Sequence, residues 1–169
     1  MIGHNNHLFQ IFLLIILFTI FFIVYTKFDR KDKFGLNIGV ANNKTTCEEY
    51  KKGKITAGSV SLIVDIADDY CKKTLGLSGR MSLDGEGMLF VFEESGNYGF
   101  WMKDMNFPID ILWIDDTFTI MGIEKEVSPD TYPKSFGEKF LAKYVLEVLS
   151  QYSDKNKINV GDKIIFSEL

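Results

Sequence analysis

The sequence predicts a mainly β domain, an antiparallel sandwich or barrel-like sheet with minor helix, preceded by one N-terminal transmembrane helix. Short apolar segments separated by Gly-, Asn- and Asp-rich turns indicate the β domain. An uncharged apolar run near the N-terminus indicates the transmembrane helix. The 169 residues include only 3 Pro and 2 Cys, so we expect one modest domain and not a disulfide-dense or disordered chain.

The transmembrane prediction depends on residues 1–26, which contain no Asp, Glu, Lys or Arg. Residues 8–25 are apolar apart from Gln10 and Thr19. As a helix they would span about 27 Å, close to the thickness of the hydrocarbon core of a bilayer. The segment has neither a basic start nor a small-residue cleavage site, so an uncleaved anchor is favoured over a cleaved signal peptide.

Residues 27–46 read as a flexible linker, because they are charged at first and then rich in Asn and Gly. Four basic side chains lie at its start, directly after the apolar run: Lys27, Arg30, Lys31 and Lys33. The positive-inside rule would keep the globular part, residues 47–169, in the cytoplasm. The family resemblance described below favours the opposite side.

The first predicted elements are a strand and a short helix. Apolar and polar residues alternate over residues 60–66, which is typical of a strand. Asp68 is placed to cap a helix over residues 69–75, and Gly76 to end it.

The remaining elements are mostly strands. Residues 109–114 are apolar on both faces, which predicts a strand in the interior of a sheet. Residues 140–149 fit a helix or a strand equally well by periodicity. Further strands are predicted at residues 88–92, 99–103, 118–127 and 163–166, with turns at 93–97, 115–117 and 159–162 and a loop at 129–133.

Several classes of function are disfavoured. The two histidines, His4 and His7, precede the apolar run, so the domain has no histidine base and no histidine-containing zinc site. There is no Walker or dinucleotide-binding motif, and we expect no cofactor. The net charge of −4 disfavours nucleic acid as a partner. We expect no metal either: Met88 and Met102 lie in apolar segments, so core packing is favoured over a Cu(I) site.

The two cysteines, Cys47 and Cys71, are too far apart for a CxxC redox pair or a metal knuckle. In an oxidising compartment they could join the start of the domain to its first helix. Two unrelated thiols are the equally weighted alternative.

Five residues are candidates for a ligand-binding site: Arg80, Trp101, Lys103, Asp110 and Glu124. Trp101 and Lys103 would share one face of the predicted strand 99–103, forming an aromatic and cationic wall. Asp110 begins an apolar strand, so its carboxylate needs a partner such as Lys103 or Arg80. A structural role for Asp110 is the favoured interpretation of that pattern.

Linked motifs over residues 56–166 resemble the family of domains of unknown function number 192, also called uncharacterised protein family 0127. The motifs that carry the resemblance are Gly76–Arg80, Gly87–Phe92, Phe100–Lys103, Pro108–Ile111, Tyr144–Glu147 and Val160–Lys163. The resemblance implies a compact, barrel-like β domain, often exported, with no established activity. Asp104-Met105 replaces the Asn-Thr usual in the family, so a family site there would be altered. Exported relatives favour an extracytoplasmic domain for this chain.

The preferred function is a membrane-anchored module that binds a small molecule or a carbohydrate through the five candidate residues. One alternative is a structural or protein-interaction domain at the membrane surface, whose motifs only specify the fold. Another is a histidine-independent hydrolase with Asp110 and Glu124 as its carboxylate pair. The sequence leans away from an enzyme.

Overall fold

The structure is a computed structural model that describes residues 47–83 and 87–169. The described residues belong to one compact unit, Thr45–Leu169. The predicted transmembrane helix (residues 1–26) and linker (27–46) lie outside the described residues. Within the described ranges, no helix is long and apolar enough to cross a membrane.

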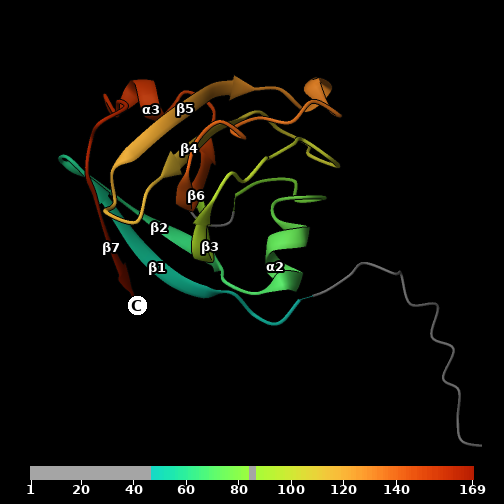
Figure 1. Ribbon diagram of the computed structural model, residues 1–169. Helices are drawn as coiled ribbons and strands as arrows, with labels where there is room; N and C mark the ends of the chain where they lie inside the picture. The colour runs from blue at the N-terminus through green and yellow to red at the C-terminus, as the bar shows by residue number, and fades with distance from the viewer. Residues whose placement is uncertain (1–46, 84–86) are drawn as a thin grey trace, which may run out of the picture. The chain divides into compact units, whose positions relative to one another are not determined.

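Seven strands form one sheet in the order β5-β4-β6-β3-β2-β1-β7 (Figure 1). The strands are β1 (Lys51–Ala57), β2 (Val60–Ala67), β3 (Gly87–Gly96), β4 (Ile109–Ile114), β5 (Ile120–Val127), β6 (Ala142–Leu149) and β7 (Ile164–Glu168). The helices are α2 (Tyr70–Leu75), the 3₁₀ turn η1 (Pro129–Thr131) and α3 (Tyr152–Lys155). The mainly β class with minor helix is therefore confirmed.

The sheet differs from the predicted antiparallel arrangement at one pair of strands. β2 and β3 are parallel, because the connection through α2 returns the chain to the same end of the sheet. All other neighbours are antiparallel, so the sheet is mixed. A sandwich of two sheets is wrong, since all seven strands belong to one sheet.

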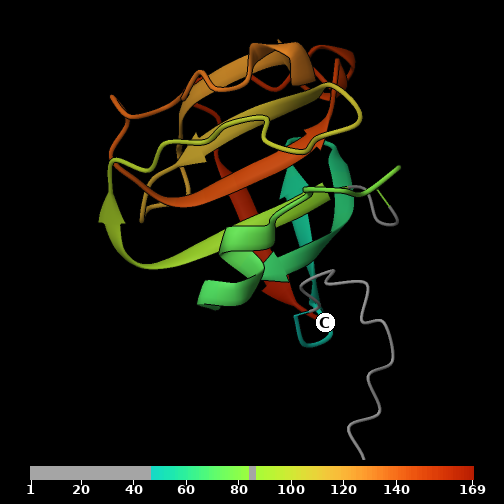
Figure 2. The same cartoon turned by 90° about the vertical axis from the view of Figure 1, so that its right-hand side faces the viewer.

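The sheet is strongly bent (Figures 1 and 2). One hydrophobic cluster takes a side chain from every strand, including Ile55 of β1, Ile120 of β5 and Ile164 of β7. The two edge strands, β5 and β7, meet next to one isolated bridge between Thr119 and Lys163. That single bridge does not close the sheet into a barrel.

A second hydrophobic cluster covers the opposite face of the sheet. Met88, Ile111 and Val145 point to this face and pack against loop residues such as Leu77 and Met102. Met88 and Met102 are fully buried there, so they fill the core as expected. The predicted interior strand is confirmed: every residue of β4 is buried, and β4 pairs with both β5 and β6.

Other predictions of elements need correction. The predicted turn at residues 93–97 is instead the continuation of β3, which runs to Gly96. The predicted strand 99–103 is reduced to one bridge, in which Phe100 and Phe136 exchange backbone hydrogen bonds. The segment predicted as either helix or strand is a strand over residues 142–149. One edge of this strand pairs with β3 and the other with β4. β1 and α3 were not predicted.

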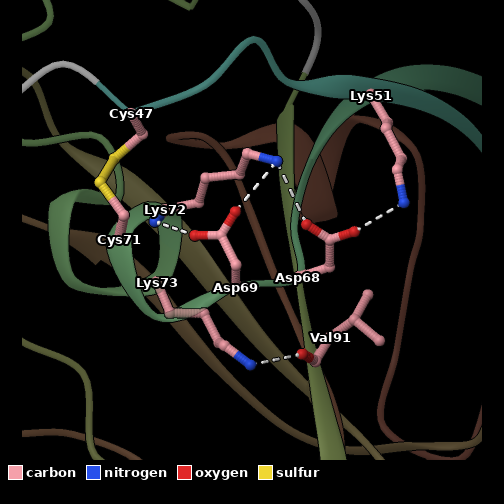
Figure 3. A network of polar contacts seen from close by, with 8 residues as sticks. All are labelled: Cys47, Lys51, Asp68, Asp69, Cys71, Lys72, Lys73 and Val91. Carbon is pink, nitrogen blue, oxygen red and sulfur yellow. Dashed lines mark hydrogen bonds and ion pairs between the residues drawn. A yellow bond between two sulfur atoms is a disulfide. The ribbon is translucent and has the colours of Figure 1, made fainter.

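The short helix α2 lies next to β3 (Figures 1 and 2) and is held at several points (Figure 3). A disulfide joins Cys71 in α2 to Cys47, with the two Cα atoms 5.7 Å apart. Asp69, one residue later than the predicted cap, accepts a hydrogen bond from the backbone N–H of Lys72. The buried Lys72 ammonium lies 3.3 Å from Asp68 and 3.1 Å from Asp69. These contacts fix α2 in place. Its residues form one wall of a cavity.

Candidate functional site

A cavity of about 180 Å³ lies between α2, β3 and the segment that follows β3. One wall is formed by residues in and just after α2, among them Lys73, Leu75 and Leu77. Aromatic side chains form much of the rest of the lining: Phe90, Phe92, Tyr98, Phe100 and Trp101. We call this cavity the aromatic pocket.

Contacts between the rings hold the aromatic pocket in shape. Phe90 and Phe100 pack edge to face, with centroids 4.8 Å apart, and Phe92 stacks on Tyr98. At the pocket's edge, Trp101 is 55% exposed and lies against Tyr132 with centroids 5.8 Å apart. Most of the lining is therefore packed in place, whereas Trp101 is open to solvent.

Glu147 is a carboxyl group that lines the aromatic pocket. It lies on β6 between two apolar neighbours, Met88 of β3 and Ile111 of β4. The residue is 5% exposed, and among the described residues its Oε2 atom has no hydrogen-bond partner. Burial raises the pKa of Glu147 to about 8, although the charge of Arg80 acts in the opposite direction. At neutral pH the side chain is therefore mostly an uncharged carboxylic acid.

The sequence interpretation missed Glu147 as a site residue. The available signal was a single acidic residue within an otherwise apolar stretch, Val145–Leu149. An acidic side chain in such a strand is either exposed at the edge of the sheet or buried at a cost in free energy, which suggests a structural or functional role. Only the pairing of β6 with a strand on each side shows that the Glu147 side chain is buried.

Arg80 does not line the aromatic pocket but lies beside it. Its guanidinium donates a 2.7 Å hydrogen bond to Asp65, which also accepts a bond from Lys52. Burial of Asp65 would raise the pKa of its carboxyl, but these two cations outweigh burial and lower the pKa. The guanidinium carbon also lies 5.0 Å from the centroid of the Tyr50 ring. Arg80 is thus already engaged by the protein itself.

Asp110 is fully buried, and its partners are backbone amides, not Lys103 or Arg80 as the sequence predicts. One oxygen accepts hydrogen bonds from the N–H groups of Glu126 and Gln151, and the other accepts one from Ser153. These bonds fix β5 and the start of α3 onto β4. The geometry agrees with the structural role favoured for Asp110.

Lys103 and Glu124 lie elsewhere. Lys103 is exposed, and its backbone carbonyl accepts a hydrogen bond from the Ser78 hydroxyl. Glu124 on β5 lines a different cavity of about 450 Å³, together with residues 134–139. Of the five candidate residues, Trp101 is therefore the one that lines the aromatic pocket.

A metal centre finds no support in the described part of the chain, where no group of three or more His, Cys, Asp or Glu side chains is placed to hold an ion. The aromatic pocket instead offers flat apolar surfaces and one buried carboxyl group. Such a lining suits a small group that is apolar over most of its surface and has one polar or charged atom.

Two solved structures are similar to this chain in fold. A crystal structure of a proposed transcription regulator from Sinorhizobium meliloti 1021 matches with a TM-score of 0.64 and 25% identity, covering 72% of this chain and 98% of that one. A protein of unknown function from Novosphingobium aromaticivorans matches with a TM-score of 0.60 and 24% identity, covering 68% and 83%.

A search of curated proteins finds no match. The family model DUF192, described as Uncharacterized ACR, matches residues 53–166. This range includes every strand from β2 to β6 and therefore the aromatic pocket with Glu147. The chain belongs to the DUF192 family.

Proposed function

We propose that the domain is a small-molecule binding module whose site is the aromatic pocket. The observation that carries the proposal is Glu147: a carboxyl group that is 5% exposed, lines a cavity, and has no hydrogen-bond partner for Oε2 among the residues described. Leaving a buried polar atom without a partner costs about 1–3 kcal/mol. A bound ligand that reaches Oε2 removes this cost.

The hydrolase alternative receives less support from the geometry. Both oxygens of Asp110 accept backbone hydrogen bonds, so this carboxylate is engaged in holding the fold. Glu124 is opposite Ile111 in the β4–β5 register, whereas Asp110 is the preceding residue on β4. Because successive side chains of a strand point to opposite faces, the two carboxylates are on opposite sides of the sheet.

The proposal includes a membrane anchor formed by residues 8–25 and an extracytoplasmic location of the domain. The apolar, uncharged sequence supports the anchor. The disulfide between Cys47 and Cys71 supports the location, since disulfides persist mainly in oxidising compartments. Lys27, Arg30, Lys31 and Lys33 support the reverse orientation.

The test is a thermal-shift screen of the full chain in mild detergent against small aromatic, aliphatic, amine and sugar compounds. A ligand at 100 times its Kd stabilises the folded state by about 2.7 kcal/mol. We expect hits whose stabilisation is lost in Trp101→Ala, at the pocket's edge, and retained in Lys103→Ala, an exposed position outside the pocket. A screen without hits, or hits that survive Trp101→Ala, would contradict the proposal.

A further inference from the structure

The composition of the aromatic pocket indicates more than a generic apolar ligand. Five of its lining residues are aromatic, and the one acidic group is Glu147. The faces of aromatic rings carry negative electrostatic potential and attract organic cations, and a carboxylate adds a full negative charge. A pocket lined by aromatic rings and a buried carboxyl group therefore favours an ammonium group over a neutral group of the same shape.

The pocket already holds one ammonium group at its wall. The Lys73 Nζ atom lies 5.3 Å from the centroid of the Phe92 ring and donates a 3.1 Å hydrogen bond to the carbonyl of Val91. The Phe92 face and this carbonyl are thus occupied by the protein's own ammonium group. Lys73 is itself bound there and leaves Glu147 to another partner.

The charges around Glu147 leave room for a cation. Its strand neighbours Met88 and Ile111 are apolar. Arg80 is the cation that acts on it electrostatically, and the Arg80 guanidinium is hydrogen-bonded to Asp65. A cation that reached Oε2 would make ionisation of Glu147 favourable in this apolar setting.

The size of the pocket limits what can enter. A cavity of about 150 Å³ is enough to hold benzene, and pockets for drug-sized ligands have about 300 Å³ or more. The aromatic pocket, at about 180 Å³, fits a head group of a few heavy atoms. The remainder of a longer ligand would lie past the exposed Trp101.

We propose that the aromatic pocket binds an organic ammonium head group, with Glu147 as its counter-ion and the rings as its cage. This inference rests on the proposed function and names the ligand class for that same site. Binding releases one proton: the Glu147 carboxylic acid loses its proton to solvent, and the carboxylate that forms pairs with the ammonium group.

The test compares two probes of nearly equal shape, by ligand-observed NMR titration of the full chain in detergent. Choline carries a quaternary ammonium group. Its uncharged analogue is 3,3-dimethyl-1-butanol (dimethylbutanol), which has carbon in place of the nitrogen. We expect choline to bind at least tenfold more tightly at pH 8. Since its binding releases a proton, its Kd falls by up to tenfold per pH unit between about pH 6 and pH 8, whereas the Kd of dimethylbutanol stays constant.

Two variants complete the test. Glu147→Gln keeps the size of the side chain and stays uncharged, so the preference for choline and its pH dependence disappear. Glu124→Gln removes a carboxylate at the other cavity and leaves both unchanged. If dimethylbutanol binds and choline binds no better, the ammonium class is wrong and the pocket remains a ligand site. If neither probe binds and the broad screen has no hits, both proposals are wrong. A preference for choline that survives Glu147→Gln also overturns the inference.

Discussion

Two buried carboxyl groups show how differently one kind of residue can be used in this domain. Asp110 is surrounded by backbone N–H groups that satisfy both of its oxygens. Glu147 is surrounded by apolar strands and rings, and within the described residues its Oε2 has no partner. The first arrangement stabilises the fold, and the second leaves a buried polar atom unpaired, which the proposed ligand would relieve.

Replacing Glu147 is expected to change how stability depends on pH. The unfolded chain loses this proton near the ordinary pKa of 4.5, whereas the folded chain retains it up to about 8. Between these values a rise in pH favours the unfolded state, by up to about 1.4 kcal/mol per pH unit. Urea unfolding at pH 5.5 and pH 7.5 should therefore show wild type losing roughly 2–3 kcal/mol relative to Glu147→Gln. Parallel pH profiles of the two proteins would contradict the raised pKa.

Asp110→Asn is expected to lower the free energy of unfolding by about 2–3 kcal/mol, because the amide group cannot accept all three backbone hydrogen bonds. Asp116→Asn, at an exposed turn position, is the matched control and should change it by less than about 0.5 kcal/mol. Urea unfolding at one fixed pH measures both. Equal midpoints for the two variants would show that the Asp110 bonds add little.

At the scale of elements, α2 depends on contacts from outside itself. A helix of six residues is too short to be stable alone. The disulfide to Cys47, the Asp69 cap and the buried Lys72 ammonium hold it beside the sheet (Figure 3). Because residues 73–75 line the aromatic pocket, these contacts also shape the site.

Reduction of the disulfide is expected to destabilise the domain by about 3 kcal/mol, since the two cysteines are 24 residues apart. The thermal midpoint of the wild-type chain should fall when a strong reductant is added. Cys47→Ser should already have the lower midpoint and should not respond to reductant. The same midpoint for oxidised and reduced wild type would show that α2 is held without the disulfide.

At the scale of the whole molecule, one hydrophobic cluster takes side chains from all seven strands, and the sheet bends around it. The bend leaves the opposite face to be covered by loop residues, among them Leu77 after α2 and Met102. The aromatic pocket lies on this opposite face, where α2, β3 and the segment after β3 do not fill all the space between them.

The full chain is expected to remain with membranes after an alkaline carbonate wash, because residues 8–25 are long and apolar enough to span a bilayer. Deletion of residues 8–25 should release the chain into the supernatant. Deletion of residues 28–45 removes the same length from the linker and should leave it in the pellet. An equal distribution of the two deletion variants would contradict the anchor.

The sequence by itself determined the β class, the interior position of residues 109–114 and the family, since these depend on local periodicity and on motifs in order. Of the five residues it proposed for a binding site, Trp101 lines the aromatic pocket. The apolar surroundings of Met102 predicted core packing, and Met102 is buried, although only a single bridge forms within residues 99–103.

The tertiary structure decided which charged residues have partners. Asp65 meets Arg80 from 15 positions away, and Asp110 meets Ser153 from 43 positions away. Glu147 becomes a buried acid only when β3 and β4 pair with both edges of its strand. Burial and hydrogen bonding of a carboxyl group depend on segments that are distant in the chain, and local sequence patterns do not contain that information.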